Sequence, residues 1–363
     1  MKIGIIGCGN IFNAYINGCA MFRAINVVAC ADINMEAAKA KATEFNLKAM
    51  TVEEMLADPS IGMVINLTIP KVHAEVSLRI LKAGKHAYSE KPLAVDVSEG
   101  RKVMDYARKK DLRVGCAPDT FLGAGLQTCR KLIDDGWIGR PLSGTAFMLG
   151  TGPEVWHPNP AFFYQRGGGP MLDLGPYYVT ALVHLLGPVK AVSAMTGKAY
   201  EKRVATCKEK FGEKLPVEVA THNSGNLLFE SGVVITMVVS FDVQRHYHSP
   251  IEIYGTEGSI GVPDPNTFGG PVSIFRPGNP DWREIPFTHG YSENARGIGV
   301  ADITHALRSG RPHRCNGNLA LHALEVMQAF EESGATKSWV EIKNRCAQPQ
   351  PFPMGMLPGV LDE

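Results

Sequence analysis

Short apolar runs alternate with amphipathic segments over the first third of the chain. Each apolar run has the length of one buried strand, and these runs span residues 2–7, 26–31, 63–67, 86–89 and 113–117. Between them, apolar residues recur at helical spacing over residues 10–22, 35–45, 71–83 and 96–110. Such strict alternation predicts a doubly wound parallel sheet with right-handed crossovers, as in a Rossmann domain. We assign residues 1–121 to this domain.

The pattern changes after residue 122. Apolar and polar residues now alternate with period two, which predicts strands at 143–149, 189–198, 218–229, 233–241, 249–254 and 259–262, with short ones near 273, 282 and 339. Helices are expected over residues 123–135, up to 186, 299–309 and 319–333. Residues 122–363 are therefore predicted to form an α+β domain with a large, open, mostly antiparallel sheet. Because an open apolar sheet face usually meets another subunit, we expect a homodimer or homotetramer formed through this sheet.

Composition excludes several classes of function. The chain has 363 residues, of which 45% are hydrophobic and 20% charged, with a formal net charge of +1. The charges form no basic block, so nucleic acid is not expected as the main partner. No apolar run approaches the roughly 20 residues that span a bilayer, and the strand-like start leaves no room for a signal peptide, so we expect a cytoplasmic protein without a membrane partner. The 8 cysteines form no Cys-x-x-Cys pair, which favours reduced buried thiols over disulfides or a metal site.

A glycine-rich turn follows the first predicted strand. Gly7 would permit a tight turn, and Gly9 would let the backbone approach a pyrophosphate at the positive start of a helix. Asn10 and Ile11 begin that helix and are counted with the site. Phe12 stands where the dinucleotide fingerprint has its third small residue, so the pattern is incomplete. A simple strand-to-helix turn would produce the same residues.

The end of the second predicted strand strengthens the dinucleotide interpretation. Asp32 follows the glycine pair by about 20 residues, where an acid should bind the adenosine ribose hydroxyls. A carboxylate there repels a 2′-phosphate and no arginine follows it, so NAD is favoured over NADP. The alternative is that Asp32 caps the next helix. Thr68, Pro70 and His73 occupy the next strand-end loop and are candidate cofactor contacts, although His73 could instead only close a helix start.

A lysine lies at the carboxyl end of the fourth predicted strand. Glu90 and Lys91 are placed there beside the crevice in which ligands of such sheets bind. Partial burial and a positive nicotinamide would both favour the neutral form of Lys91, which suits it to handle a hydroxyl proton. A solvated surface lysine is the common alternative.

Asp173 and Tyr177 are a second pair of candidates. They are four residues apart, so on a helix they would share one face. Pro176 fits best at a helix start, which would place Asp173 in the preceding turn and Tyr177 in the first turn. Both side chains could then point into one cleft. The alternative is an aspartate cap beside a core tyrosine.

These residues together resemble a known family, the glucose–fructose oxidoreductase, inositol dehydrogenase and rhizopine-catabolism (Gfo/Idh/MocA) oxidoreductases. The resemblance covers almost the full chain and is carried by Gly7-Cys8-Gly9, Asp32, Thr68-x-Pro70-x-x-His73, Glu90-Lys91-Pro92, three glycines before Leu172-Asp173-x-Gly175, Gly255-Thr256-Glu257-Gly258 and Ala320-Leu321-His322. Members typically have Asp-x-x-x-His, and Tyr177 stands in place of that histidine. In this respect the chain resembles the aldose-oxidising branch. The resemblance also implies a cis peptide before Pro92.

The resemblance implies an NAD-dependent dehydrogenase acting on a cyclic sugar. A ring C–H would deliver hydride to the nicotinamide while the attached hydroxyl loses its proton. Tyr177 is the implied proton acceptor, with Lys91 lowering its pKa and hydrogen-bonding the same oxygen; Lys91 acting directly as the base is the alternative. Asp173 would hold Lys91 or a sugar hydroxyl. Further candidates for the wall of the sugar site are Trp156, His157, Tyr164, Arg166 and His246.

Two other functions would use the same fold. In an NAD-dependent glycosidase or eliminase, transient oxidation of the sugar weakens a neighbouring bond. A non-catalytic sugar regulator would bind dinucleotide without turnover. Such a regulator would be expected to lose the lysine and the acid, whereas this chain keeps Lys91 and Asp173.

Overall fold

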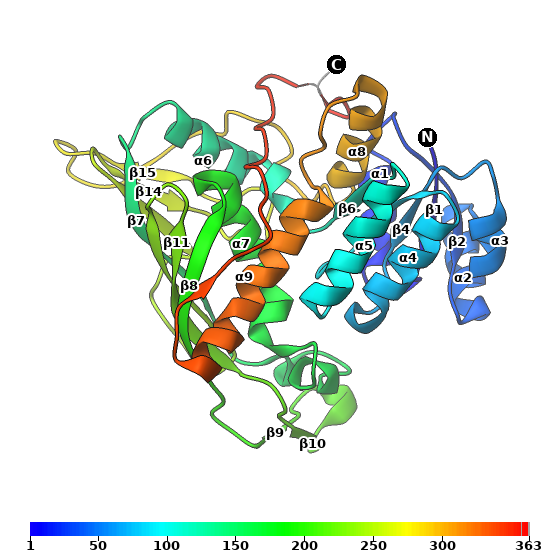
Figure 1. Cartoon of the computed structure of the whole chain (residues 1–363), viewed down its shortest axis with the longest axis horizontal. Helices are drawn as coiled ribbons and strands as arrows, with labels where there is room; N and C mark the ends of the chain where they lie inside the picture. The colour runs from blue at the N-terminus through cyan, green and yellow to red at the C-terminus, as the bar shows by residue number, and fades with distance from the viewer. Residues whose placement is uncertain (357, 362–363) are drawn as a thin grey trace.

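The computed structural model describes residues 1–356 and 358–361, and it contains two large sheets toward opposite sides of the molecule (Figure 1). The first sheet is parallel, with the strand order β3-β2-β1-β4-β5-β6. Its strands are β1 (Lys2–Ile6), β2 (Asn26–Ala31), β3 (Lys48–Met50), β4 (Met63–Asn66), β5 (His86–Ser89) and β6 (Val114–Cys116). The predicted doubly wound sheet is confirmed. The order reverses between β1 and β4, which is where such sheets bind ligands.

The sequence explains where the helices of this sheet begin. Thr51 and Glu54 form a capping box, in which each side chain accepts a hydrogen bond from the other's backbone N–H. Asn34 and Asp96 cap two further helices through their side-chain oxygens. The helices are α1 (Phe12–Cys19), α2 (Met35–Phe45), α3 (Val52–Ala57), α4 (His73–Lys82) and α5 (Val97–Lys109).

The second sheet has the order β16-β15-β14-β13-β7-β12-β11-β8-β17. Its pairs are antiparallel except for β7 with β12, which is parallel. The strands are β7 (Pro141–Leu149), β8 (Val189–Gly197), β11 (His222–Phe229), β12 (Val234–Ser240), β13 (Ile251–Gly255), β14 (Ser259–Val262), β15 (Ser273–Phe275), β16 (Arg283–Glu284) and β17 (Val340–Glu341). A separate ribbon of β9 (Lys202–Val204) and β10 (Lys214–Pro216) was not expected, because three-residue strands carry too little pattern.

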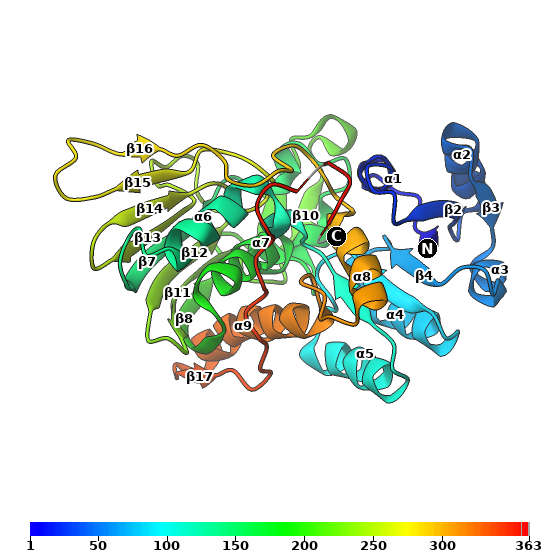
Figure 2. The same cartoon turned by 90° about the horizontal axis from the view of Figure 1, so that it is seen from above.

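Three helices, α6 (Ala124–Asp134), α7 (Gly169–Leu186) and α9 (Gly317–Thr336), cover one face of the second sheet. A fourth helix of this half of the chain is α8 (Ile298–Ser309). Both views show α9 between β8 and α5 (Figures 1 and 2), while α8 returns to pack on α1 and β6. Along β7, buried residues alternate with partly exposed ones, so the other face of this sheet is open.

Helix α7 differs from the expected arrangement. It begins at Gly169, before Asp173, and contains Pro176 in its interior. Fifteen of its 18 residues are buried, and this packing outweighs the helix-breaking preference of a proline. Within residues 1–356 and 358–361, no helix is both long enough and apolar enough to cross a membrane. All the cysteines are free, and only Cys346 is not fully buried.

Candidate active site

The glycine turn and two strand ends enclose a groove of about 420 Å³. Gly7 has φ +103°, and a Cβ there would lie 2.5 Å from the carbonyl oxygen of Leu67, so only glycine fits. A Cβ at Gly9 would meet nothing within 4 Å, which leaves its backbone open to a ligand. Asn10 and Ile11 precede α1, and Ile11 is its N-cap residue. The turn therefore has the space and exposed backbone that a dinucleotide pyrophosphate requires.

Asp32 lies in the same groove at the end of β2. Its two carboxylate oxygens accept hydrogen bonds from the backbone N–H groups of Cys8 and Asn34, each at 2.8 Å. The residue that caps α2 is Asn34, so the helix-cap alternative for Asp32 is wrong. An arginine that sequence reasoning missed, Arg79 of α4, also lines the groove and forms an ion pair with Glu53 at 2.7 Å.

The loop after β4 lies between the groove and the Glu90-Lys91-Pro92 loop. Thr68 lines the groove, and its hydroxyl donates to Asn66 Oδ1 at 2.6 Å. Pro70 begins a short 3-10 turn. His73 is buried behind this loop, with Nδ1 2.7 Å from the carbonyl oxygen of Pro92 and Nε2 2.9 Å from that of Thr68. His73 therefore connects the loop after β4 with the Glu90-Lys91-Pro92 loop, and it does not line the groove.

Hydrogen bonds to the buried Glu90 carboxylate hold the Glu90-Lys91-Pro92 loop in place. The peptide before Pro92 is cis, as the resemblance implied. Glu90 is buried; its Oε1 accepts a hydrogen bond from the Tyr15 hydroxyl and its Oε2 from the backbone N–H of Lys91, both at 2.8 Å. Tyr15 therefore fixes the Glu90 carboxylate, whose second oxygen orients the backbone that carries Lys91.

Lys91 contacts the other two catalytic candidates, Asp173 and Tyr177. Its ammonium donates to the carboxylate of Asp173 at 2.9 Å and to the Asp173 carbonyl oxygen at 2.6 Å. It also lies 5.2 Å from the centroid of the Tyr177 ring. Pro176 has no N–H and removes one hydrogen bond from this turn of α7, which is where Lys91 contacts the helix.

The charge state of Lys91 differs from expectation. Burial disfavours its ammonium, but the neighbouring Asp173 carboxylate, Tyr177 and Glu90 outweigh burial and raise the pKa of Lys91 above its usual value. Without a nicotinamide beside it, the raised pKa favours the charged form of Lys91, in contrast to the neutral form expected from the sequence.

Tyr177 has a second cationic neighbour that sequence reasoning missed. Arg296 donates to the Tyr177 hydroxyl and to Asn266 Oδ1, both at 3.4 Å. Burial raises the pKa of Tyr177, whereas Lys91 and Arg296 act to lower it. Arg296 comes from the loop just before α8, far away in sequence and outside any motif, so no sequence pattern indicated it.

A second cavity of about 330 Å³ adjoins Asp173. Asp173, Leu174 and Tyr178 of α7 line one side, and the end of β7 lines another. Trp156 and His246, both exposed, also line this cavity. Among the described residues, no group of three or more histidine, cysteine or acidic side chains could hold a metal ion.

Three expected wall residues lie elsewhere. Tyr164 is fully buried, and its hydroxyl donates to Glu154 instead of facing a sugar. His157 does not line the cavity, and its ring packs against that of Trp156 with 5.3 Å between the ring centroids. Arg166 is exposed, and its charge acts on Asp96, lowering the pKa of that carboxyl after the larger effect of hydrogen bonds from Ser98.

Two family models match the chain. Residues 1–117 match an oxidoreductase family with an NAD-binding Rossmann fold, and residues 126–261 match the GFO/IDH/MocA C-terminal domain. The chain belongs to the GFO/IDH/MocA oxidoreductase family. Its first domain is accordingly an NAD-binding Rossmann domain, in agreement with the groove at Gly7, Gly9 and Asp32.

Relatives in the GFO/IDH/MocA family include sugar dehydrogenases and reductases. The 1,5-anhydro-D-fructose reductase of Ensifer adhaerens is 27% identical over 71% of this chain and 74% of its own length. The D-xylose dehydrogenase of Paenarthrobacter nicotinovorans is 26% identical over 80% of each chain. A structure of levoglucosan dehydrogenase with NADH, 23% identical, covers 95% of this chain and 99% of its own with a TM-score of 0.79, which shows a common fold.

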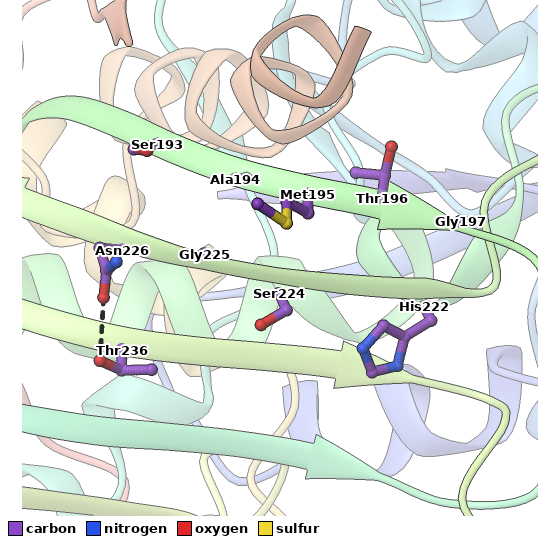
Figure 3. A pocket seen from close by; sticks show the side chains of 10 residues that line it. All are labelled: Ser193, Ala194, Met195, Thr196, Gly197, His222, Ser224, Gly225, Asn226 and Thr236. Atoms are coloured by element: carbon purple, nitrogen blue, oxygen red, sulfur yellow. Dashed lines mark hydrogen bonds between the residues drawn. The ribbon is translucent and has the colours of Figure 1, made fainter. Parts of the chain in front are cut away.

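This GFO/IDH/MocA protein has a further hollow of about 540 Å³ on the open face of β8, β11 and β12 (Figure 3). Small and polar side chains line it, with a hydrogen bond of 2.9 Å from Thr236 to Asn226. Among the described residues, neither an acid nor a lysine lines this hollow.

Proposed function

We propose that this protein is an NAD-dependent dehydrogenase that oxidises a CH–OH group of a cyclic sugar, an aldose or a related polyol or glycoside. The observation that carries the proposal is the contact of Lys91 with both Asp173 and Tyr177. These three side chains lie at the end of β5, next to the sheet's ligand-binding edge, and Asp173 also lines the second cavity. Of the three side chains, Asp173 lines this cavity, and it holds the Lys91 ammonium at 2.9 Å next to a sugar bound there.

The groove fits NAD in shape and charge. Gly7 and Gly9 leave the backbone accessible for the pyrophosphate, and the oxygens of Asp32 can accept hydrogen bonds from the ribose hydroxyls. A negative carboxylate there disfavours the 2′-phosphate of NADP. When bound, NAD supplies the acceptor for the hydride that leaves the sugar carbon.

The chain's own residues handle the proton. Lys91, held charged by Asp173, donates a hydrogen bond to the reacting hydroxyl oxygen and stabilises the negative charge that develops on it. Tyr177 accepts the proton in its phenolate form. Burial outweighs the two cations Lys91 and Arg296 and keeps the pKa of Tyr177 above its usual value, so the rate should rise toward alkaline pH. Asp173 orients Lys91 through its side chain and its backbone carbonyl.

A substrate screen tests the proposal. Purified protein is incubated with NAD and separately with aldoses, inositols and glycosides, and NADH formation is followed by absorbance. Stoichiometric NADH from one class of sugar supports it. Absence of turnover in both directions, with NAD and with NADH, would refute it, and release of an aglycone without net NADH would instead identify the glycosidase mechanism.

We also propose that the open face of the second sheet mediates homo-oligomer formation, as a dimer or tetramer. Met195, which lines the hollow of Figure 3, is 80% exposed, an unusual environment for an apolar side chain. Light scattering should give a multiple of the monomer mass, and Met195→Glu should lower it. A monomeric wild-type protein at micromolar concentration would contradict this assignment.

A further inference from the structure

Three segments that are far apart in sequence meet in a buried polar cluster behind the second cavity. Glu154 comes from the long loop after β7, Arg203 from β9 of the ribbon, and Asp242 from the segment after β12. Their side chains are only 9%, 8% and 11% exposed. Buried charges of this kind are costly unless they are paired and hydrogen-bonded, so the cluster must be held together by specific contacts.

One guanidinium contacts both carboxylates. Arg203 Nη1 donates to Glu154 Oε1 at 2.6 Å, and Nη2 donates to the Asp242 carboxylate and to the Phe241 carbonyl oxygen at 3.0 Å. The remaining carboxylate oxygens are also satisfied. The hydroxyl of Tyr164 donates to Glu154, and that of Thr221 donates to Asp242 at 2.6 Å.

The two acids belong to the segments that form the outer wall of the cavity. Pro153 and Trp156, on either side of Glu154, line the cavity. Phe241 and His246, on either side of Asp242, line it as well. The two segments also meet through a backbone bridge between Thr151 and Asp242.

Arg203 itself does not line the cavity; it stands behind the wall. The ribbon that carries it is fastened to the same loop by backbone N–H groups of Thr206 and Cys207, which both donate to the Glu154 carbonyl oxygen at 2.9 Å. Without the guanidinium, two carboxylates would face each other in a buried site. Their repulsion and their need for water would then separate the wall segments.

We propose that Arg203 is a positioning residue that clamps the two wall segments together and thereby sets the size of the sugar that the cavity accepts. This inference rests on the proposed sugar dehydrogenase function. It assigns the ribbon of β9 and β10 a role in specificity, although none of its residues lines the cavity.

The variant Arg203→Met tests the clamp, because methionine keeps much of the length and removes the charge. The matched control is Lys210→Met, which removes a cation in the same ribbon from an exposed pair with Glu213 at 3.0 Å. The kcat/KM for a monosaccharide is compared with that for a glycoside carrying a bulky aglycone. We expect the ratio of the two values to shift by about tenfold or more in Arg203→Met, mainly through KM of the smaller sugar. The affinity for NADH should stay within about twofold of the wild-type affinity, because the groove lies elsewhere.

If Arg203 contributed only to stability, its replacement would lower kcat/KM for both substrates by the same factor and leave their ratio unchanged. An unchanged ratio in a folded Arg203→Met protein therefore overturns the proposal. If this variant does not fold, Arg203→Lys provides the same comparison, since one ammonium cannot reach both carboxylates as a guanidinium does. A wild-type ratio in Arg203→Lys would then overturn it, and a shifted ratio would support it.

Hydrogen exchange separates failure of the clamp from failure of the proposed function. Backbone amides in residues 151–164 and 241–248 should exchange faster in the Arg203 variant than in Lys210→Met. This result needs no substrate. If the wild-type protein turns over no sugar, the proposed function fails. Hydrogen exchange still tests whether Arg203 holds the two wall segments together. Equal exchange rates in the two variants would rule the clamp out.

Discussion

Replacing Lys91 by methionine tests the catalytic geometry most directly. Methionine keeps an unbranched apolar stem of similar reach and removes the ammonium that donates to Asp173 at 2.6 and 2.9 Å. In the proposed mechanism, the reacting hydroxyl oxygen of the sugar then loses its charged hydrogen-bond donor. Tyr177 also loses one of the two cations that favour its phenolate. Loss of a side chain that takes part in proton transfer typically lowers the rate by a factor of about 10² to 10⁴. We therefore expect kcat to fall by about 10³-fold, which corresponds to about 4 kcal/mol of transition-state stabilisation.

The effect on stability should be much smaller. The ion pair is partly accessible, with side chains 16% and 25% exposed, so water can replace the lost contact at Asp173. We expect a loss of about 1 kcal/mol in the free energy of unfolding, and a melting temperature lower by about 1–2 °C. The pKa of Lys91 is raised on folding, so this advantage of the wild-type protein is fully present below about pH 10 and is lost as the pH rises through the folded-state pKa.

The assay is NADH formation under saturating NAD, with NADH affinity measured separately by fluorescence. Lys102→Met, which changes an exposed lysine on α5, is the matched control and should keep wild-type rates. The reasoning is refuted if Lys91→Met turns over within about tenfold of the control. It is also refuted if the variant loses NADH binding, because the defect would then lie in the groove rather than in proton transfer.

Three further predictions concern the groove and the phenol. Asp32→Ala should relax the preference for NAD over NADP, and an unaltered ratio of kcat/KM for the two cofactors would remove Asp32 from the ribose role. For Tyr177→Phe, we expect at least a 10²-fold loss of kcat and loss of the alkaline rise in rate that the raised pKa of Tyr177 predicts; a wild-type pH profile would exclude it as the base. Arg296→Met removes a cation from the Tyr177 hydroxyl, so that rise should move to higher pH and kcat should fall; a profile that stays in place would show that Arg296 does not act on Tyr177.

The local pattern of apolar and polar residues was sufficient to predict most strands and helices of the first domain. The strands at 26–31 and 86–89 and the helix at 35–45 have the expected bounds, because each is a short apolar or amphipathic unit between turn residues or caps. The Thr51–Glu54 capping box was also found where the sequence predicted it. The division of the chain into residues 1–121 and 122–363 stays a prediction, and α8 packs on the first sheet although it lies in the second range.

Side-chain environment was harder to predict than backbone form. Tyr164 was expected on the sugar wall because tyrosines suit polyols, yet Glu154 and Arg203 hold it in the interior. Lys91 was expected to be neutral, but the carboxylate that reverses this lies 82 residues away in sequence. Arg296 reaches Tyr177 from 119 residues further along the chain.

By itself, the sequence determined the alternation of strands and helices, the glycine turn with its acid at Asp32, and the positions of Lys91, Asp173 and Tyr177. These features depend on local periodicity and on short motifs, which are properties of neighbouring residues. Only the tertiary structure decided the raised pKa of Lys91, the partner of Tyr177 and the buried ion pairs of Arg203. The physical reason is that pKa values and buried ion pairs depend on distances of a few ångströms between segments that only folding brings together.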